Sequence, residues 1–269
     1  MQIFELTIYF LIGLAVGSFS NVCIYRLPIE KSIILPKSHC PNCKTPIPFY
    51  YNIPLVSYLS LKGQCAFCQN KITIRYFIVE LLTALFFLFF GWKYGLSINL
   101  VYFLILIPVF IVIFFIDLRH LIIPDSLVLL IGILALGKLF LPNLDSIFTS
   151  LYSSALGALV VFTLIGGLII FYQYVRKIEG MGLGDLKLFV VLGFLFGIKG
   201  IMFILIVSSL SGVIIGSIIL ICKNKNFQSQ LPFGPYIIIA TLIYILLGLP
   251  LINFTENMLI HYLQFIYLT

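Results

Sequence analysis

Long apolar runs alternate with short polar stretches along almost the entire chain. Within each run the apolar residues are continuous instead of alternating with polar ones, which excludes a transmembrane β-barrel and predicts membrane-spanning helices. We therefore predict an all-α membrane protein. Its spans, about eight in number, are expected at residues 4–24, 76–92, 98–116, 123–141, 150–174, 186–198, 200–222 and 232–250.

The longest polar stretch, residues 25–75, separates the first two spans and divides the chain into two predicted parts. Residues 1–95 form a helix, a polar insert and a second helix, whereas residues 96–250 form a six-helix unit. The apolar tail, residues 251–269, is expected to lie in the membrane interface or to pack at the edge of the bundle. Three polar residues interrupt this tail: Asn253, Glu256 and His261.

The composition agrees with a multi-pass membrane protein. Hydrophobic residues make up 62% of the 269 residues and charged residues only 9%, whereas soluble domains carry about 25% charged residues. The mean hydropathy is +1.18. The first run, Ile3–Tyr25, lacks a basic start and contains Glu5 near its beginning. We therefore interpret it as a retained helix and not as a cleaved signal peptide.

The distribution of positive charge predicts the orientation in the membrane. The net charge is +7, but in a membrane protein the placement of Lys and Arg is more informative than their sum, and we expect no nucleic-acid partner. Placing the 25–75 insert in the cytoplasm puts thirteen of the sixteen Lys and Arg residues on that side and leaves Lys93, Lys138 and Lys199 outside. Eight spans then leave both termini outside.

The polar insert contains two C-x2-C motifs, Cys40-Pro-Asn-Cys43 and Cys65-Ala-Phe-Cys68, separated by 21 residues. Two such motifs supply four thiolates for a tetrahedral Zn²⁺ ion, and a cytoplasmic location disfavours disulfides. Four protein ligands leave no coordination position for water. We therefore expect a structural zinc that holds together a loop too small to have its own core. His39 is a competing ligand by position, although four cysteines suffice.

A glycine-rich stretch, Glu179-Gly-Met-Gly-Leu-Gly-Asp-Leu-Lys187, places Asp185 at the edge of a predicted span. Glycines at alternate positions, Gly180, Gly182 and Gly184, permit backbone conformations and close approaches that a Cβ would prevent. An ionisable residue at a membrane edge is a functional candidate. The alternative is a flexible interhelical loop whose aspartate caps the next helix.

Three further acids lie in or beside the predicted spans: Glu80, Asp117 and Asp125. Asp117 ends the third span, where a negative charge opposes the helix dipole, so a functional role is favoured over a structural one. Asp125 follows a proline in a typical helix start, and we favour a helix-capping role for it. Glu80 lies one turn inside the second span, where a pairing with Arg75 or Arg26 and a contact to a cofactor are both open.

Two aspartates at the cytoplasmic ends of different helices can face each other across a wet cavity. Like charges a few ångströms apart do not both ionise, so the pair shares one proton. The ionised carboxylate then takes a proton from the water that attacks a peptide carbonyl, and the neutral one protonates the carbonyl oxygen or the leaving amine. This arrangement indicates aspartyl proteolysis without a covalent enzyme intermediate.

Several motifs follow one another in a fixed order along the chain. They are Gly17-Ser-Phe-Ser-Asn-Val-Cys-Ile-Tyr-Arg-Leu-Pro28, the paired C-x2-C motifs, Asn52-Ile-Pro54, Arg75-Tyr76 with Val79-Glu80, Asp117 with Ile123-Pro-Asp125, the Gly-Met-Gly-Leu-Gly-Asp run with Lys187, and Pro232-Phe-Gly-Pro235. Their order and spacing resemble those of the type IV prepilin leader peptidases, bifunctional peptidases and N-methyltransferases of the Gly-x-Gly-Asp class. The resemblance covers about residues 13–240 and rests on order and spacing, because no single piece is specific.

By this resemblance Asp117 and Asp185 are the catalytic pair. The resemblance assigns substrate binding to residues around the second aspartate and to a proline motif: Gly182, Gly184, Lys187, Pro232, Phe233, Gly234 and Pro235. Without the resemblance, the proline motif would be interpreted as a helix-breaking turn at the start of the eighth span. The family removes the basic leader of prepilins and pseudopilins at the cytoplasmic face, cutting after a glycine. It then methylates the new α-amine with S-adenosylmethionine.

The 25–75 insert implies both activities, since relatives without it only cleave. No Gly-x-Gly-x-x-Gly fingerprint of a nucleotide site is present. The methyl donor is therefore expected within residues 1–95, with Asn21, Arg26 and Glu80 as its candidate contacts. The resemblance also implies the bacterial cytoplasmic (inner) membrane and substrates of pili or type II secretion. It indicates neither the particular pilin-like substrate nor the oligomeric state.

Two other interpretations account for parts of the sequence. A proton-coupled transporter would use Asp117, Asp125 and Asp185 as a relay, but it leaves the glycine run, the proline motif and the cysteines without a joint reason. A non-enzymatic zinc-binding membrane adaptor predicts that replacing the aspartates is silent. Cleavage of a peptide by the detergent-solubilised protein distinguishes the enzyme from both.

Overall fold

The computed structural model describes residues 2–141, 144–145, 147–176, 182–222 and 231–248. The regular elements among these residues are helical and include eight α-helices. The chain divides into two compact units, residues 1–127 and 128–269. The predicted interfacial tail, residues 251–269, lies outside the described residues.

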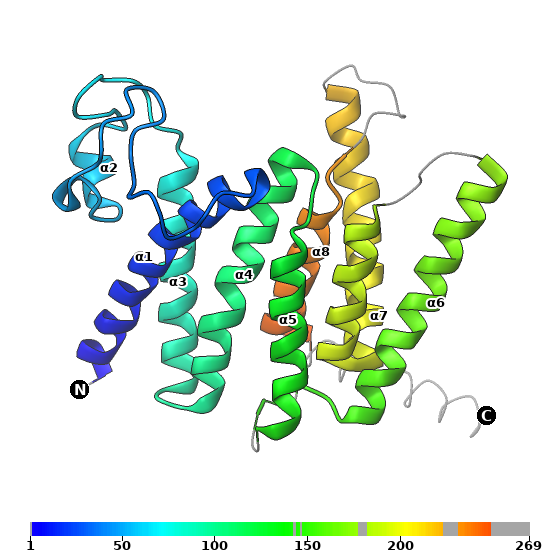
Figure 1. Cartoon of the computed structure of the whole chain (residues 1–269). Coiled ribbons are helices and arrows are strands. Elements are labelled where there is room, and N and C mark those ends of the chain that lie inside the picture. Colours follow the sequence, from blue (N-terminus) through cyan, green and yellow to red (C-terminus); the bar gives the residue numbers. More distant parts are fainter. Residues whose placement is uncertain (1, 142–143, 146, 177–181, 223–230, 249–269) are drawn as a thin grey trace, which may run out of the picture. The chain divides into compact units, whose positions relative to one another are not determined.

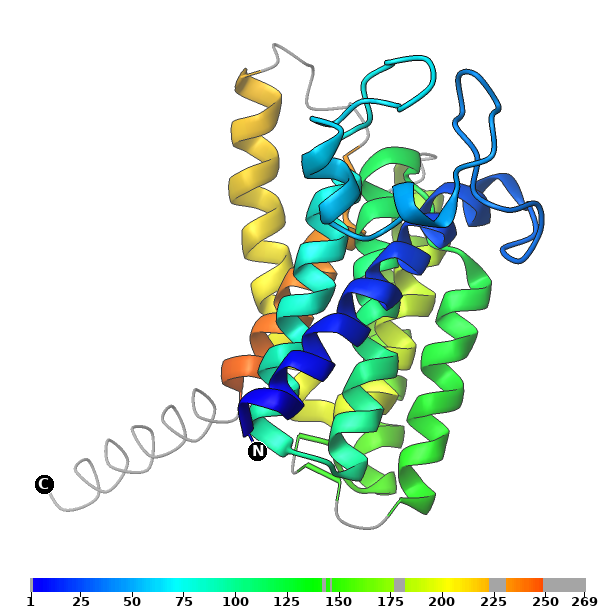
Figure 2. The same ribbon diagram turned by 90° about the vertical axis from the view of Figure 1, so that its left-hand side faces the viewer.

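The first unit consists of three long helices and the polar insert. Its elements are α1 (Gln2–Arg26), η1 (Leu27–Ile29), η2 (Phe49–Tyr51), α2 (Val56–Ser60), α3 (Arg75–Tyr94) and α4 (Ile98–His120). α1 packs against α3 and α4 (Figure 1). The insert lies where α1 ends and α3 begins, at the opposite end of α1 from the N-terminus (Figure 2).

Small residues let α1 approach α3 closely. A Cβ at Gly13 would lie 2.6 Å from the Cα of Ala84, and one at Gly17 would lie 2.7 Å from the Cα of Glu80. These two glycines have the G-x3-G spacing by which helices pack in membranes, a signal that the sequence analysis did not use. One turn after Gly17, Asn21 reaches the first turn of α3.

The second unit contains most of α5 together with the later helices. Its elements are α5 (Asp125–Gly137), η3 (Lys138–Phe140), α6 (Leu151–Arg176), α7 (Leu183–Cys222), α8 (Gly234–Ile243) and η4 (Tyr244–Gly248). α7 has 40 residues but is broken at Gly197, where φ is 68° and ψ is −172°. A positive φ is readily adopted by glycine alone. The predicted spans 186–198 and 200–222 correspond to the two halves of α7.

A buried lysine holds the break in α7. Lys138 Nζ donates to the carbonyls of Phe194 (2.8 Å) and Leu195 (2.6 Å), at the end of the first half of α7, and to Ser154 Oγ on α6 (2.7 Å). The last carbonyls of a helix lack intrahelical partners, and here the lysine supplies them. Lys138 is buried, with 5% of its surface exposed, and its place on the outer side of the membrane stays a prediction.

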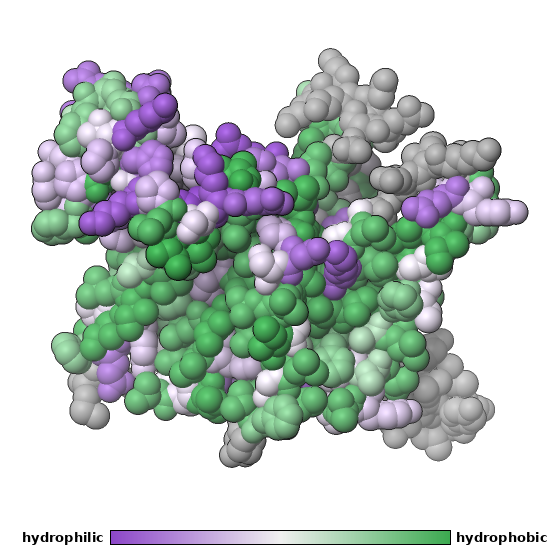
Figure 3. All heavy atoms as spheres, viewed as in Figure 1, coloured by the Kyte–Doolittle hydropathy of each residue, from purple (hydrophilic) through white to green (hydrophobic). Residues whose placement is uncertain are grey.

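Among the residues that the structure describes, five helical segments are long and apolar enough to cross a membrane: Ile3–Ile29, Arg75–Tyr94, Ile98–His120, Leu151–Val175 and Leu183–Cys222. α5, with 13 residues, and α8, with 10, are shorter. Apolar residues cover the helices on the face shown in Figure 3, whereas polar residues gather on the insert. The all-helical class is thus confirmed for the described residues, and the count of eight spans stays a prediction.

Candidate functional site

The two C-x2-C motifs fold into matching turns. In each, the N–H of the residue four positions after the first cysteine donates to that cysteine's carbonyl, at 2.9 Å for both Cys40 and Cys65. The residue after the second cysteine, Lys44 or Gln69, has a left-handed backbone with φ of 58° or 55°. An isolated β-bridge closes each turn. Both turns thus have the same local geometry, and the fold of the insert brings their cysteines together.

The four sulfur atoms lie close enough to share one metal ion. The Sγ atoms of Cys40, Cys43, Cys65 and Cys68 are all within 4.8 Å of one another, and those of Cys40 and Cys68 are 3.8 Å apart. Tetrahedral Zn²⁺ with bonds of about 2.3 Å requires sulfur–sulfur separations of about 3.8 Å, so the donor set fits. His39 lies outside this group, and its Nδ1 is 3.1 Å from the Lys37 carbonyl.

The surroundings of three of these sulfurs favour the thiolate form. The Thr45 side chain hydrogen-bonds to Cys43 and lowers its pKa. Backbone N–H groups within the second turn lower the pKa of Cys65 and Cys68. Burial raises the pKa of Cys40 to about 11. A bound metal favours the thiolate at all four positions, because a coordinating thiol is deprotonated.

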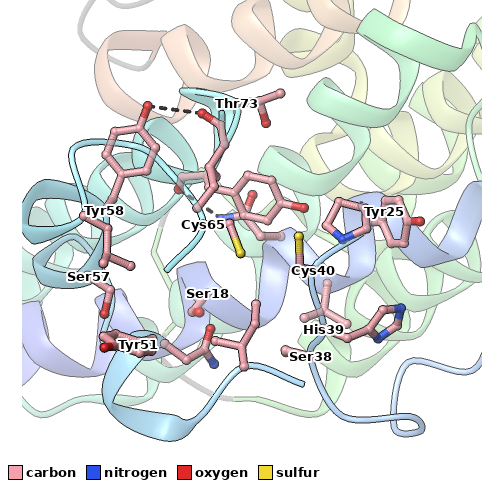
Figure 4. A pocket seen from close by; sticks show the side chains of 18 of the residues that line it. Ser18, Tyr25, Ser38, His39, Cys40, Tyr51, Ser57, Tyr58, Cys65 and Thr73 are labelled. Carbon is pink, nitrogen blue, oxygen red and sulfur yellow. Dashed lines mark hydrogen bonds between the residues drawn. The ribbon is translucent and has the colours of Figure 1, made fainter. Parts of the chain in front are cut away.

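A cavity of about 370 Å³ lies between the insert and the adjoining ends of α1, α3 and α4 (Figure 4). Its size falls in the range of small-molecule sites, about 300–1,000 Å³. The predicted cofactor residues Asn21, Arg26 and Glu80 all line it, as do Cys40 and Cys65. Several tyrosines also border it, namely Tyr25, Tyr51, Tyr58 and Tyr76. One cavity therefore brings the predicted cofactor residues beside the cysteine cluster.

Two of these predicted cofactor residues bond to the backbone of the insert. Arg26 donates to the carbonyls of Ser32 (2.9 Å) and Pro36 (2.6 Å). Glu80 Oε2 accepts from the N–H of Leu55 (2.8 Å), a residue with a positive φ of 59°. The sequence left an arginine partner open for Glu80, and this bond runs to the backbone. Both side chains thus position the loops that form the cavity wall.

Two polar atoms in the cavity wall lack a hydrogen-bond partner among the described residues. They are Oδ1 of Asn21, a side chain that is 2% exposed, and the buried Nε of Arg75. Both residues line the cavity. Such groups are costly to leave unpaired, so they indicate a ligand or water that completes them. From the sequence, Arg75 was a motif residue and a possible partner of Glu80, and an arginine at a helix start has many other ordinary roles.

Asp117 lies in the last turn of α4 with 4% of its surface exposed. Its carbonyl accepts the N–H of Leu121, whose left-handed φ of 58° ends the helix. Two residues after Asp117, Arg119 lines the cavity. The end of α4 is therefore at the insert end of the first unit. Asp117 occupies the helix terminus that disfavours a negative charge.

Asp185 lies in the first turn of α7, in the second unit. Its N–H donates to the carbonyl of Gly182 (3.1 Å), and a Cβ on Gly182 would lie 3.4 Å from Asp185 Oδ2. Gly184 and the exposed Lys187 belong to the same turns of α7. Gly180 lies outside the described residues. At this helix terminus a negative charge is favoured.

The Pro232–Pro235 motif lies beside the first half of α7. Pro232 and Phe233 precede α8, and the buried Gly234 and Pro235 begin it. The Phe233 ring is 6.1 Å from that of Phe189, which follows Asp185 by one turn. The motif is thus both a helix start and a neighbour of the Asp185 helix.

The three aspartates occupy different helix ends. Asp125 begins α5 and is exposed, at the helix start that the sequence predicts. Asp117 belongs to the first unit and Asp185 to the second. The pairing of these two residues therefore stays a prediction.

Two family models match the chain. Residues 11–94 match the bacterial peptidase A24 N-terminal domain, and residues 104–217 match the type IV leader peptidase family. No solved structure matches the chain.

Similar proteins from several bacteria cover nearly its full length. The prepilin leader peptidase/N-methyltransferase of Legionella pneumophila is 38% identical, over 90% of this chain and 91% of its own. The proteins of the same name from Neisseria gonorrhoeae and Pseudomonas aeruginosa are each 36% identical, over 85% and 88% of this chain and 86% and 89% of theirs. The family resemblance is thus confirmed, and the chain belongs to the type IV leader peptidase family.

Proposed function

We propose that the protein removes the leader peptide of type IV prepilins and pilin-like proteins and then methylates the new N-terminal residue. The observation that carries this proposal is the similarity over 90% of the chain to a Legionella pneumophila protein whose name states both activities. The two aspartates that the resemblance assigns support the peptidase activity. The cysteine-containing insert supports the methyltransferase activity.

Asp117 and Asp185 form the peptidase pair. The helix dipole favours a negative charge on Asp185, at the start of α7, and disfavours it on Asp117, at the end of α4. We therefore assign to Asp185 the removal of a proton from the attacking water. Asp117 holds the shared proton and donates it to the carbonyl oxygen or the leaving amine.

The substrate-binding residues surround Asp185. A hydrogen-bonded helix hides its carbonyls, so the substrate must be locally extended at the cut. Glycines at 182 and 184 leave room for an extended backbone beside the carboxylate, and Pro232–Pro235 packs along the same helix through Phe233. Lys187 adds an exposed positive charge to this surface. The peptidase unit is residues 96–250.

Methyl transfer belongs to residues 1–95. The cavity there, with its tyrosines and unpartnered polar atoms, fits S-adenosylmethionine. That cofactor supplies an activated methyl group when bound. Arg26 and Glu80 hold the loops around it, and Asn21 faces it. A structural Zn²⁺ on Cys40, Cys43, Cys65 and Cys68 ties these loops together, since two of the ligands also line the cavity.

The protein crosses the bacterial inner membrane about eight times, with both termini outside. Arg26, Arg75 and Arg119 gather around the cavity at the insert end of the first unit. The positive-inside rule places such a cluster in the cytoplasm. Prepilin leaders would then reach the enzyme at the cytoplasmic face, and the 251–269 tail would lie in the interface or beside the bundle.

The test is incubation of the purified protein with a prepilin-like peptide and S-adenosylmethionine, read by mass spectrometry. We expect loss of the leader and addition of one methyl group. Asp117→Asn and Asp185→Asn should each lower cleavage by about 100-fold or more, because each removes one role in proton transfer. Asp125→Asn is the matched control and should be milder.

The outcomes separate the alternatives. An uncut peptide with the parent protein would favour a transporter or an adaptor. Cleavage at the parent rate by Asp185→Asn contradicts the two-aspartate mechanism. A loss in Asp125→Asn equal to that in Asp117→Asn would reopen the choice of partner.

A further inference from the structure

We propose that Arg75 and Asn21 hold the amino-acid end of the methyl donor, with Arg75 on its carboxylate and Asn21 on its ammonium group. The proposal rests on the proposed methyltransferase function. It adds Arg75, which the family resemblance contributed only as part of a motif, and it gives each candidate contact a separate task.

Among the described residues, the amide nitrogen of Asn21 has a hydrogen-bond partner and its amide oxygen does not. Its Nδ2 donates to the Tyr76 carbonyl at 3.0 Å. This bond fixes the orientation of the amide, because a carbonyl oxygen pairs with the nitrogen and not with Oδ1. Oδ1 is then the atom without a partner among the described residues, in a side chain that is 2% exposed. An acceptor of this kind is complemented by a donor such as an ammonium group.

Arg75 has the opposite requirement. Its guanidinium lies over the Tyr76 ring, 4.9 Å from the ring centroid, which limits its orientation. Its buried Nε, a donor, lacks a partner among the residues that the structure describes. Arg119 lines the same cavity and adds a second positive charge. A guanidinium in a fixed orientation is suited to bind a carboxylate through parallel N–H groups.

The unmatched acceptor and the unmatched donor border the same turn of the chain. Asn21 is bonded to the carbonyl of the residue that follows Arg75, so both groups flank the start of α3. An α-amino acid carries its ammonium and carboxylate on adjacent atoms, and S-adenosylmethionine ends in such a group. Arg26 and Glu80 already bond to the insert backbone. The fold therefore leaves Asn21 and Arg75 for the ligand.

A zwitterionic lipid headgroup presents the same pair of charges. Phosphatidylethanolamine carries an ammonium and a phosphate, whereas phosphatidylcholine has no N–H to donate to Asn21. The two sources are separated by measuring ligand binding in nanodiscs of either lipid.

The experiment is calorimetric titration of the full-length protein in phosphatidylcholine nanodiscs. The ligands are S-adenosylhomocysteine, its decarboxylated analogue and 5′-methylthioadenosine, none of which transfers a methyl group. We expect the parent to bind S-adenosylhomocysteine about 10- to 100-fold more tightly than the other two, as for a hydrogen-bonded charge. Arg75→Met should bind S-adenosylhomocysteine and its decarboxylated analogue with similar, weak affinity. Both should still bind more tightly than 5′-methylthioadenosine, which lacks the ammonium group that contacts Asn21. Lys31→Met, an exposed lysine outside the cavity, should behave as the parent.

The ligand series on the parent decides the question even if Arg75→Met fails to fold. Equal affinity of the parent for S-adenosylhomocysteine and its decarboxylated analogue overturns the Arg75 assignment and leaves the methyltransferase function intact. Binding of none of the three overturns the methyl-donor site itself. The remaining outcome concerns phosphatidylethanolamine nanodiscs. If S-adenosylhomocysteine binds there no more tightly than its decarboxylated analogue, a lipid headgroup occupies this wall of the cavity.

Discussion

Arg26 and Glu80 form hydrogen bonds to backbone atoms of the insert, which has little regular secondary structure of its own. Arg26 donates to two carbonyls of the insert, and Glu80 accepts from the N–H of Leu55. The turns of the insert satisfy some of its backbone polar groups, and side chains from the neighbouring helices satisfy others. We therefore expect these two residues to influence methyl transfer through the position of the loops.

Substitutions at Glu80 test this positioning role. Glu80→Ala should lower the affinity for S-adenosylhomocysteine by about tenfold or more, because the N–H of Leu55 loses its acceptor. Glu80→Gln keeps an acceptor oxygen and should cost less than about threefold. Calorimetric titration measures both variants. Equal losses would mean that the negative charge itself contacts the ligand.

Among the helices of the second unit, α6 and α7 meet through glycines. A Cβ at Gly193 would lie 2.8 Å from the carbonyl oxygen of Gly157, and one at Gly157 would lie 2.6 Å from that of Gly193. Backbone atoms cannot yield as a flexible side chain does. The contact therefore sets the distance between the first half of α7, which begins near Asp185, and α6.

Gly193→Val should push these helices apart and destabilise the protein by about 1–3 kcal/mol. The measurement is thermal unfolding in detergent. Gly167→Val on α6 is the matched control, because a Cβ there meets nothing within 4 Å. An equal change in both variants would attribute the effect to valine in a helix and not to the contact.

Lys138, on η3, donates hydrogen bonds to carbonyls at the break in α7. Its substitution is a second test of helix packing. Lys138→Met should lower the free energy of unfolding by about 1–3 kcal/mol for each carbonyl left unsatisfied. The carbonyls concerned belong to Phe194 and Leu195. Thermal unfolding reports the change. An unaltered melting temperature would show that other groups satisfy these carbonyls.

For the whole molecule, the proposed chemistries fall largely in different units. The cysteine cluster and the cavity belong to the first unit, and Asp185 with the Pro232–Pro235 motif belongs to the second. Asp117 is the member of the proposed peptidase pair that lies in the first unit. Damage confined to the insert should therefore affect the two activities unequally.

Removal of zinc is the corresponding test. We expect one zinc per chain and, after chelation, a loss of methyl transfer larger than the loss of cleavage by about tenfold or more. The reason is that Cys40 and Cys65 form part of the cavity wall, and metal binding orders loops that lack a core. Metal analysis and the two activities measured on one sample check this. Pure protein with no zinc and four free thiols would contradict it.

Local patterns in the sequence were sufficient for the helical class, the family and the convergence of the cysteines. Apolar runs longer than the hydrocarbon core of a membrane predict helices without knowledge of their neighbours. The C-x2-C spacing acts within one turn, so each motif folds as its own residues dictate. The interruption expected at residue 199 is found at Gly197, because glycine is the residue that permits a positive φ there.

Contacts between distant parts of the chain decided which polar groups have hydrogen-bond partners. In the sequence, Arg26 and Arg75 flank apolar runs and Glu80 lies one turn inside one, so their positions alone do not distinguish their roles. Lys138 is buried and donates to carbonyls 56 and 57 positions away. Asn21 bonds to a carbonyl 55 residues away. Such pairings follow from how closely two helices approach, and a local pattern of apolar and polar residues does not contain that distance.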